Sequence, residues 1–267
     1  MKPLNTLWRA ETAQLSEVAT ICLSARPLSD TSLVRWKLNF TKIIVICGAV
    51  GAFARPALAQ QTLNLSLGHF TGSSDRSEAD ILLIEHHDLA FEFPDFNAVS
   101  IGGELLFPIG EKFEAGAGLS LSQRTVSTAH VRTFNADGSS IPRILALRQV
   151  PIAATFRFLP LRQAYRVQPY AGGGLAVIGW HFTESGDFVI GGNVFRGEHY
   201  ETSGTTVGPV FLLGLRVVGD RLAIGMEGRH QHARGSFGPG FARVHDPDID
   251  LNGWTISGTV GLRLRVP

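Results

Sequence analysis

The chain is poor in charge, in cysteine and in long apolar runs, and each shortage excludes a class of protein. Charged residues are 18% of its 267 residues, and the formal net charge is +1. A nucleic-acid-binding protein carries a basic patch or stripe, so we expect no nucleic-acid partner. No run of about 20 apolar residues is present, which excludes a helical membrane protein. Glycine, in contrast, is abundant, with 30 residues.

Residues 33–59 have the pattern of a secretory signal peptide. An apolar core of 11 residues, Ile43–Phe53, is too short to span a bilayer. The basic residues before it are Arg35, Lys37 and Lys42. The segment Ala57-Leu58-Ala59 has the A-x-A form of a cleavage site, so we expect export and cleavage after Ala59. Residues 1–32 show no pattern and stay unassigned, and our hypothesis for them is a start codon read too early.

The expected mature chain, residues 60–267, contains no cysteine. Cys22 and Cys47 both lie in the part removed, so no disulfide framework holds the exported protein together. The remaining 208 residues carry 17 basic and 20 acidic side chains, a formal charge of −3. A chain of this size without disulfides has to be held together by its architecture.

Apolar and polar residues alternate through most of the mature chain. From Trp254 to Val266 every second residue is apolar or glycine, and the residues between are small or charged. This period of 2 over 13 residues is longer than the usual soluble strand, and no helix accommodates it. The same alternation recurs seven times upstream and predicts eight strands. They are residues 62–70, 97–107, 112–124, 147–158, 167–182, 204–217, 221–233 and 254–266.

The fourth predicted strand is the least regular of the eight. Leu145 and Leu147, at its beginning, have the opposite parity from Val150. We expect a β-bulge at this point, which would bring all three side chains to the same face.

The connections between the predicted strands alternate in length. The short ones are Pro108–Glu111, Leu159–Arg166 and Val218–Asp220. The long ones, of about 17–26 residues, are Thr71–Phe96, Thr125–Ala146, Thr183–Ser203 and Arg234–Asp250. An even strand number with short turns at one end and long loops at the other is typical of outer-membrane barrels. We therefore predict an all-β fold, an eight-stranded antiparallel up-and-down transmembrane β-barrel.

Charged side chains gather on one face of the predicted strands. A lipocalin-like barrel would turn the other, apolar face inward around a ligand, but eight strands of bulky apolar residues leave little room for one. We expect the charged face to line a narrow lumen, where buried charges persist only when they are paired. Its members are Glu104, Glu114, Arg124, Arg157, Arg216, Glu227, Arg229, Arg263 and Arg265. The expected partners are Arg263 or Arg216 for Glu104 and Glu114, and Arg263 or Arg229 for Glu227.

Four aromatic residues are candidates for the girdles of a membrane barrel. They are Tyr170, Trp180, Phe182 and Trp254. Tyr170 and Trp180 share a face and are separated by roughly 25 Å along the membrane normal, at ~3.3 Å per residue and a tilt near 40°. The alternative is two ordinary aromatics on a buried strand.

Four segments carry a family resemblance: residues 99–126, 147–160, 167–180, which contains Pro-Tyr-x-Gly-x-Gly, and 254–266. With them, residues 60–267 resemble the small outer-membrane β-barrel family of the outer-membrane-protein-A type. The resemblance implies the outer membrane of a Gram-negative-type bacterium. It also implies three kinds of partner: outer-membrane lipid, the barrel-assembly machinery and periplasmic chaperones. The sequence departs from the family in having no peptidoglycan-binding domain after the barrel, and in ending Val266-Pro267 instead of in an aromatic residue.

No residue pattern predicts catalysis, a cofactor or a metal site. Adjacent His86 and His87 point in different directions and have no second pair at ligand spacing. His230 and His232 share a face, for which a position at the level of the lipid headgroups is the commoner explanation. No serine stands at triad spacing from a histidine and a carboxylate. We therefore expect no enzyme and no cofactor.

The sequence leaves the function less defined than the fold. We expect an envelope-structural, adhesive or recognition role carried by the long outer loops. A narrow, porin-like channel for small solutes is the first alternative. An outer-membrane enzyme and a secreted ligand-binding barrel are the others, and the last of these would stay soluble without detergent.

Overall fold

The computed structural model describes residues 61–73, 80–135, 137–190, 193–237 and 248–264. All of them belong to one compact unit of the chain, Leu58–Pro267. The predicted extension 1–32 and signal peptide 33–59 lie outside the described residues. No helix in the described part is both long enough and apolar enough to cross a membrane.

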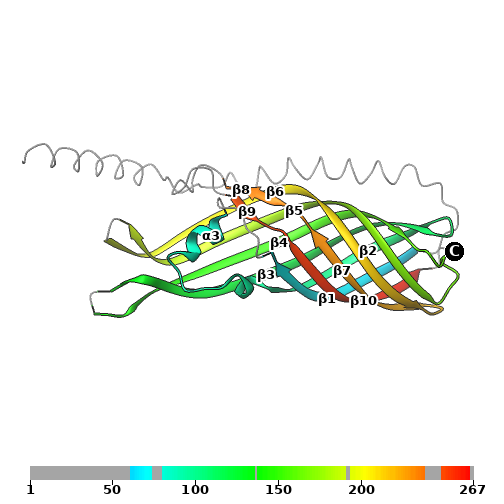
Figure 1. Ribbon diagram of the computed structural model, residues 1–267, viewed down its shortest axis with the longest axis horizontal. Helices are drawn as coiled ribbons and strands as arrows, with labels where there is room; N and C mark the ends of the chain where they lie inside the picture. The colour runs from blue at the N-terminus through cyan, green and yellow to red at the C-terminus, as the bar shows by residue number, and fades with distance from the viewer. Residues whose placement is uncertain (1–60, 74–79, 136, 191–192, 238–247, 265–267) are drawn as a thin grey trace, which may run out of the picture. The chain divides into compact units, whose positions relative to one another are not determined.

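Eight strands close into one antiparallel barrel in the order β1-β10-β7-β6-β5-β4-β3-β2 (Figure 1). The strands are β1 (Gln61–Gly72), β2 (Ala98–Ile109), β3 (Phe113–Phe134), β4 (Ser140–Phe158), β5 (Val167–Ile190), β6 (Asn193–Val218), β7 (Leu222–Gln231) and β10 (Gly253–Leu264). Each of these strands pairs with the one that follows it in this list, and the last, β10, pairs with β1 to close the ring. The predicted eight-stranded up-and-down barrel is therefore confirmed.

The ring of strands is staggered. When paired residues are followed once around the barrel from Gly72 of β1, the path returns to β1 at Thr62, ten residues earlier. A stagger requires the strands of a closed barrel to tilt by about 35–45° from its axis. Each residue therefore advances about 2.5 Å along the axis.

Large apolar side chains point outward all round the ring. On β7, Leu222, Ile224 and Met226 are exposed and alternate with the buried Ala223 and Glu227. Others on the outer wall are Leu65, Leu67, Val99, Ile101, Leu119, Leu175, Val207, Phe211, Leu213, Ile256 and Val260. Such a continuous apolar surface is suited to lipid and not to water. The lipocalin-like alternative placed this face inside, and the outward direction of these side chains contradicts it.

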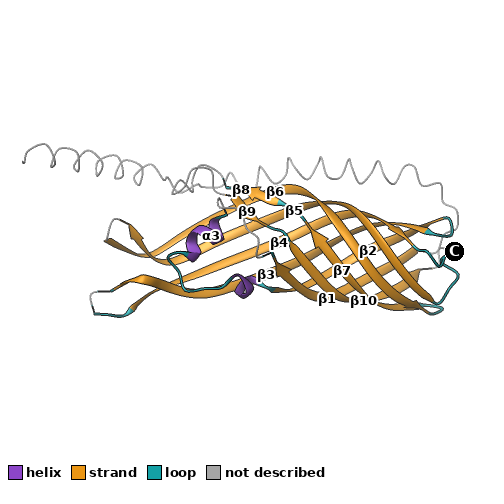
Figure 2. Ribbon diagram, in the orientation of Figure 1, coloured by secondary structure: helices purple, strands orange, loops and turns teal. Residues whose placement is uncertain are grey.

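Four strands are longer than predicted and project from the barrel as two hairpins, β3–β4 and β5–β6 (Figure 2). The expectation of long loops over 125–146 and 183–203 was wrong, because most of these residues belong to the four strands. Beyond a bilayer the outward face of a strand is no longer required to be apolar. The alternation that identified the strands therefore fades there, although the hydrogen-bonded ladder continues.

The predicted bulge in the fourth strand is absent. One register pairs β4 with β5 from Arg143 to Phe158, and β4 keeps one register with β3 past the same residues. Leu145 and Leu147 are both buried inside the barrel. Leu145 and Leu147 face an interior that is apolar at this level. Their parity therefore differs from that of Val150, although the strand has no bulge.

Shorter elements fold over the end of the barrel from which the hairpins project. The first connection contains α3 (Ile81–His86) and the 3-10 turn η1 (Phe93–Phe96), and β8 (Arg234–Ser236) pairs with β9 (Asp248–Asp250). Leu89 also bridges to His130 of β3. Apolar side chains from these segments and from the barrel interior pack into one core. Its members are Ile81, Leu82, Leu89, Phe91, Phe96, Val126, Leu145, Leu147, Ala153, Ala176, Ile178, Trp180, Phe182, Val210, Ala233, Phe237, Ile249 and Leu251.

Candidate functional site

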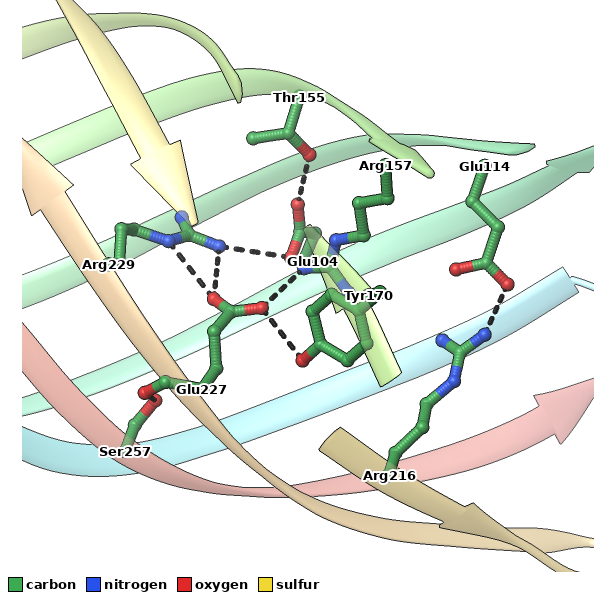
Figure 3. A network of polar contacts seen from close by, with 9 residues as sticks. All are labelled: Glu104, Glu114, Thr155, Arg157, Tyr170, Arg216, Glu227, Arg229 and Ser257. Atoms are coloured by element: carbon green, nitrogen blue, oxygen red, sulfur yellow. Dashed lines mark hydrogen bonds and ion pairs between the residues drawn. The ribbon is translucent and has the colours of Figure 1, made fainter. Parts of the chain in front are cut away.

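Four charged side chains meet inside the barrel around Arg157 of β4 (Figure 3). Arg157 Nη2 contacts Glu104 of β2 and lies 2.8 Å from Glu227 Oε2 of β7. Arg229 Nη2 lies 3.1 Å from Glu104 Oε2 and 2.9 Å from Glu227 Oε1. Since β2, β4 and β7 are not neighbours in the ring, the network crosses the lumen. Two arginines balance two glutamates, so each buried charge has partners of opposite sign.

Neutral polar groups complete this network. Thr155 Oγ1 donates to Glu104 Oε1 at 2.7 Å, and the Tyr170 hydroxyl donates to Glu227 Oε2 at 3.0 Å (Figure 3). The Arg157 guanidinium also lies 4.8 Å from the centre of the Tyr170 ring, within cation–π range. Each of the two carboxylates therefore accepts a hydrogen bond from a neutral hydroxyl group in addition to its ion pairs.

Two glycines make room for these side chains. A Cβ on Gly116 would lie 2.4 Å from both Glu104 Oε1 and Thr155 Oγ1. A Cβ on Gly214 would lie 2.3 Å from the Tyr170 ring. Part of the high glycine content is therefore explained by the crowding of large polar side chains inside a narrow barrel.

A second ion pair lies closer to the short turns of the barrel. Arg216 of β6 pairs with Glu114 of β3, and its Nε donates to Gln168 Oε1 at 2.9 Å. The sequence predicted Arg216 as one of two possible partners of Glu114.

The structure brings six of the nine predicted lumen charges together in these two groups. The predicted partner Arg263 does not join them, because its Nη1 donates to the Gly219 carbonyl oxygen at 3.0 Å. Arg124 is exposed, and its Nε donates to the Asp95 carbonyl oxygen at 2.9 Å. Arg265 lies outside the described residues.

The predicted aromatic girdle was wrong for three of its four members. Tyr170, Trp180 and Phe182 are 2%, 3% and 0% exposed, because the even-numbered residues of β5 face the interior. Trp254 is 54% exposed on the outer wall, with its ring 4.8 Å from that of His230. The sequence offered one signal for the correct face: Tyr170 shares its parity with the polar Gln168.

The projecting hairpins hold polar groups of their own, and so does the cap, by which we mean residues 80–97 together with β8 and β9. Arg143 and Glu184 pair inside the hairpins at 2.5 Å, and the Arg143 guanidinium lies 3.8 Å over the Phe188 ring. At the β3–β4 turn, hydrogen bonds from Ser139 hold the pKa of Asp137 below its ordinary value. In β9, burial raises the pKa of the Asp248 carboxyl.

The barrel interior contains a small cavity lined by both polar and apolar residues. Its volume is about 40 Å³, enough for a few water molecules. Among the residues lining it are Ser66, Ser100, Ser122, Gln231 and Ser257. Glu104, Glu227 and Arg229 line it as well, so the ion-pair network forms part of its wall.

These features define a class of protein: an eight-stranded barrel with an apolar outer wall and a lumen filled by side chains. No family model matches the chain, and no curated protein matches it. Solved structures of small barrels do match it, and three of those with probability 1.00 are described here.

The first of these is the outer membrane protein OprG from Pseudomonas aeruginosa, 12% identical over 78% of this chain and 97% of that one, with a TM-score of 0.48. Neisserial surface protein A is 10% identical over 77% and 97%, with a TM-score of 0.42. Ail of Yersinia pestis, solved with the heparin analogue sucrose octasulfate, is 10% identical over 77% and 99%, with a TM-score of 0.41. The likeness is one of strand topology and does not extend to a ligand or an activity.

Proposed function

We propose that this chain is an integral outer-membrane protein with a sealed barrel, whose function resides in the cap and hairpins outside the membrane. In this proposal residues 33–59 direct export and are removed, and the mature protein is not an enzyme. Its role is recognition or envelope structure at the cell surface.

The filled interior is the observation that carries the proposal. Arg157 is fully buried and joins glutamates from β2 and β7, so side chains bridge the lumen from wall to wall. Nearer the outer end, apolar side chains such as Leu145, Ile178 and Phe182 pack against the first connection. A solute would have to pass both layers. An eight-stranded barrel is just wide enough for side chains to fill it.

The length of the hairpins supports a role outside the membrane. β2 pairs with β3 no farther along than Ser122, yet β3 continues to Phe134. β7 pairs with β6 no farther than Val210, yet β6 begins at Asn193. Twelve residues of β3 past Ser122 span roughly 30 Å along the axis. Both hairpins therefore present a large, ordered surface beyond the bilayer.

A narrow channel is the second candidate, and the cavity of about 40 Å³, whose wall includes Glu104, Glu227 and Arg229, is the observation that favours it. Single-channel recording in planar bilayers separates the two. The sealed barrel predicts no unitary conductance above background for the wild-type protein. Steady openings that change in Arg157→Ala would establish the channel and overturn the proposed sealed barrel.

A further inference from the structure

The end of the barrel that carries the short turns has an excess of positive charge. The turns 110–112, 159–166 and 219–221, together with the last residues of β10, hold five basic and only two acidic side chains. The acidic residues are Glu111 and Asp220. The basic residues, which we call the basic rim, are Lys112, Arg162, Arg166, Arg221 and Arg263.

Little of this charge is neutralised within the protein. Arg162 Nη1 lies 3.2 Å from Glu111 Oε2, and both side chains are exposed. Within the part of the chain that the structure describes, no other member of the basic rim forms an ion pair with an acid. Arg166 and Arg221 are exposed, so their guanidinium groups are accessible to an anion from outside the protein.

Backbone hydrogen bonds hold three of the arginines beside one another along the rim. The amide of Val218, at the end of β6, donates to the Arg166 carbonyl oxygen at 2.7 Å. Arg221 directly precedes β7, and its carbonyl oxygen accepts from the Arg263 amide at 2.9 Å. Arg166, Arg221 and Arg263 therefore follow one another from β5 to β10.

The apolar outer wall begins directly beside these arginines. Val167 follows Arg166 along the chain, and Leu222 follows Arg221. Both apolar side chains are exposed on the outer wall, and so is Val217, which pairs with Val167 in the ladder. A molecule that fits this edge therefore has an anionic group joined to an apolar part.

We propose that the basic rim binds the phosphate group of an anionic phospholipid in the inner leaflet of the outer membrane, an inference that rests on the proposed orientation with the hairpins outside. The guanidinium groups of Arg166 and Arg221 bind phosphate through paired N–H···O hydrogen bonds. The acyl chains of the same lipid contact Val217 and Leu222. Tyr165, exposed beside Arg166, is suited to the headgroup level because its ring is apolar and its hydroxyl polar. A free phosphate would leave the apolar wall uncovered, so we assign the phosphate to a lipid.

The test is fluorescence quenching of a tryptophan near the rim by brominated lipids in vesicles. The reporter protein carries Trp180→Phe, Trp254→Phe and Ile224→Trp, which leaves the expected mature chain with one tryptophan, on the outer wall above Arg221. Phosphatidylcholine vesicles contain either brominated phosphatidylglycerol or brominated phosphatidylcholine. We expect phosphatidylglycerol to be preferred by about 5-fold for each of the two arginines at low salt, and the preference to shrink at high salt.

Charge-removing variants assign the preference to the rim. Arg166→Gln and Arg221→Gln each lower the preference about 5-fold, and the double variant shows none. Arg148→Gln on β4 is the matched control, an exposed arginine towards the hairpins, and leaves the preference unchanged. A second control retains Trp254 alone, at the start of β10 and far from the rim, and shows no preference.

A heat-dependent shift in gel mobility verifies that each variant has folded. Equal quenching by the two brominated lipids would overturn the proposal, and so would an undiminished preference in the double variant. If inorganic phosphate removes the preference where sodium chloride of the same ionic strength does not, the rim takes free phosphate and the assignment to a lipid is wrong. Absence of quenching by either lipid would instead contradict the membrane-spanning barrel itself, so failure of this inference and failure of the proposed function give different results.

Discussion

Arg157 lies at the centre of the ion-pair network inside the barrel. It is fully buried and shares Nη2 between Glu104 and Glu227, and Arg229 contacts the same two carboxylates. A buried ion pair contributes little net stability compared with apolar residues of the same volume. Removing one partner, however, leaves the opposite charge buried without compensation.

Arg157→Ala should therefore lower the free energy of unfolding by about 3–5 kcal/mol. The reason is that Glu104 and Glu227 would retain only Arg229 as a cationic partner. Urea unfolding in detergent micelles, followed by tryptophan fluorescence, measures the difference. A variant that unfolds at the wild-type urea concentration would show that this network does not stabilise the fold.

Gly214 gives a second prediction at the scale of a single residue. Gly214→Ala places a methyl group against the Tyr170 ring, and overpacking of this kind costs about 1–3 kcal/mol. Gly228→Ala on β7 is the control, because its nearest neighbour is the Leu213 carbonyl oxygen at 3.9 Å. The same unfolding measurement should show a loss for Gly214→Ala and none for Gly228→Ala. Equal losses would refute the steric explanation.

At the scale of elements, the sequence predicted the strands within the apolar band well and the hairpins poorly. β10 was predictable because its outward residues from Trp254 to Leu264 are almost all large and apolar. The extensions of β3 to β6 carry no such pattern, since their outward faces lie beyond the band. β5 was assigned the wrong face because Ile178, Trp180 and Phe182 are apolar but pack on an apolar core inside the barrel. An apolar side chain in such a strand is therefore not by itself a sign of contact with lipid.

The direction of β5 side chains can be tested with the two tryptophans of the expected mature chain, Trp180 and Trp254. Variants Trp254→Phe and Trp180→Phe each retain one of them, and brominated lipids quench tryptophans that contact acyl chains. Trp254 should be quenched because it lies on the outer wall, and Trp180 should not, because it is buried inside. Strong quenching of Trp180 would restore the girdle that the sequence indicated.

At the scale of the whole molecule, the barrel interior has two regions of different polarity, and the sequence analysis did not distinguish them. Near the short turns the interior is polar and filled by ion pairs, and towards the hairpins it is an apolar core shared with α3 and β8–β9. The charge network was predictable from the parity of residues such as Glu104 and Glu227. The apolar core was not, because its members from the first connection, such as Leu82 and Phe91, come from a segment without strand periodicity.

The most direct test of a closed, membrane-spanning barrel is the mobility of the protein in SDS gels before and after boiling. The protein is extracted from outer membranes in detergent, and one half of the sample is heated. A ring in which every strand is paired resists SDS until heated, so the account predicts that the two halves run at different positions. Identical mobility of the two halves, together with a protein that stays in solution without detergent, would contradict it.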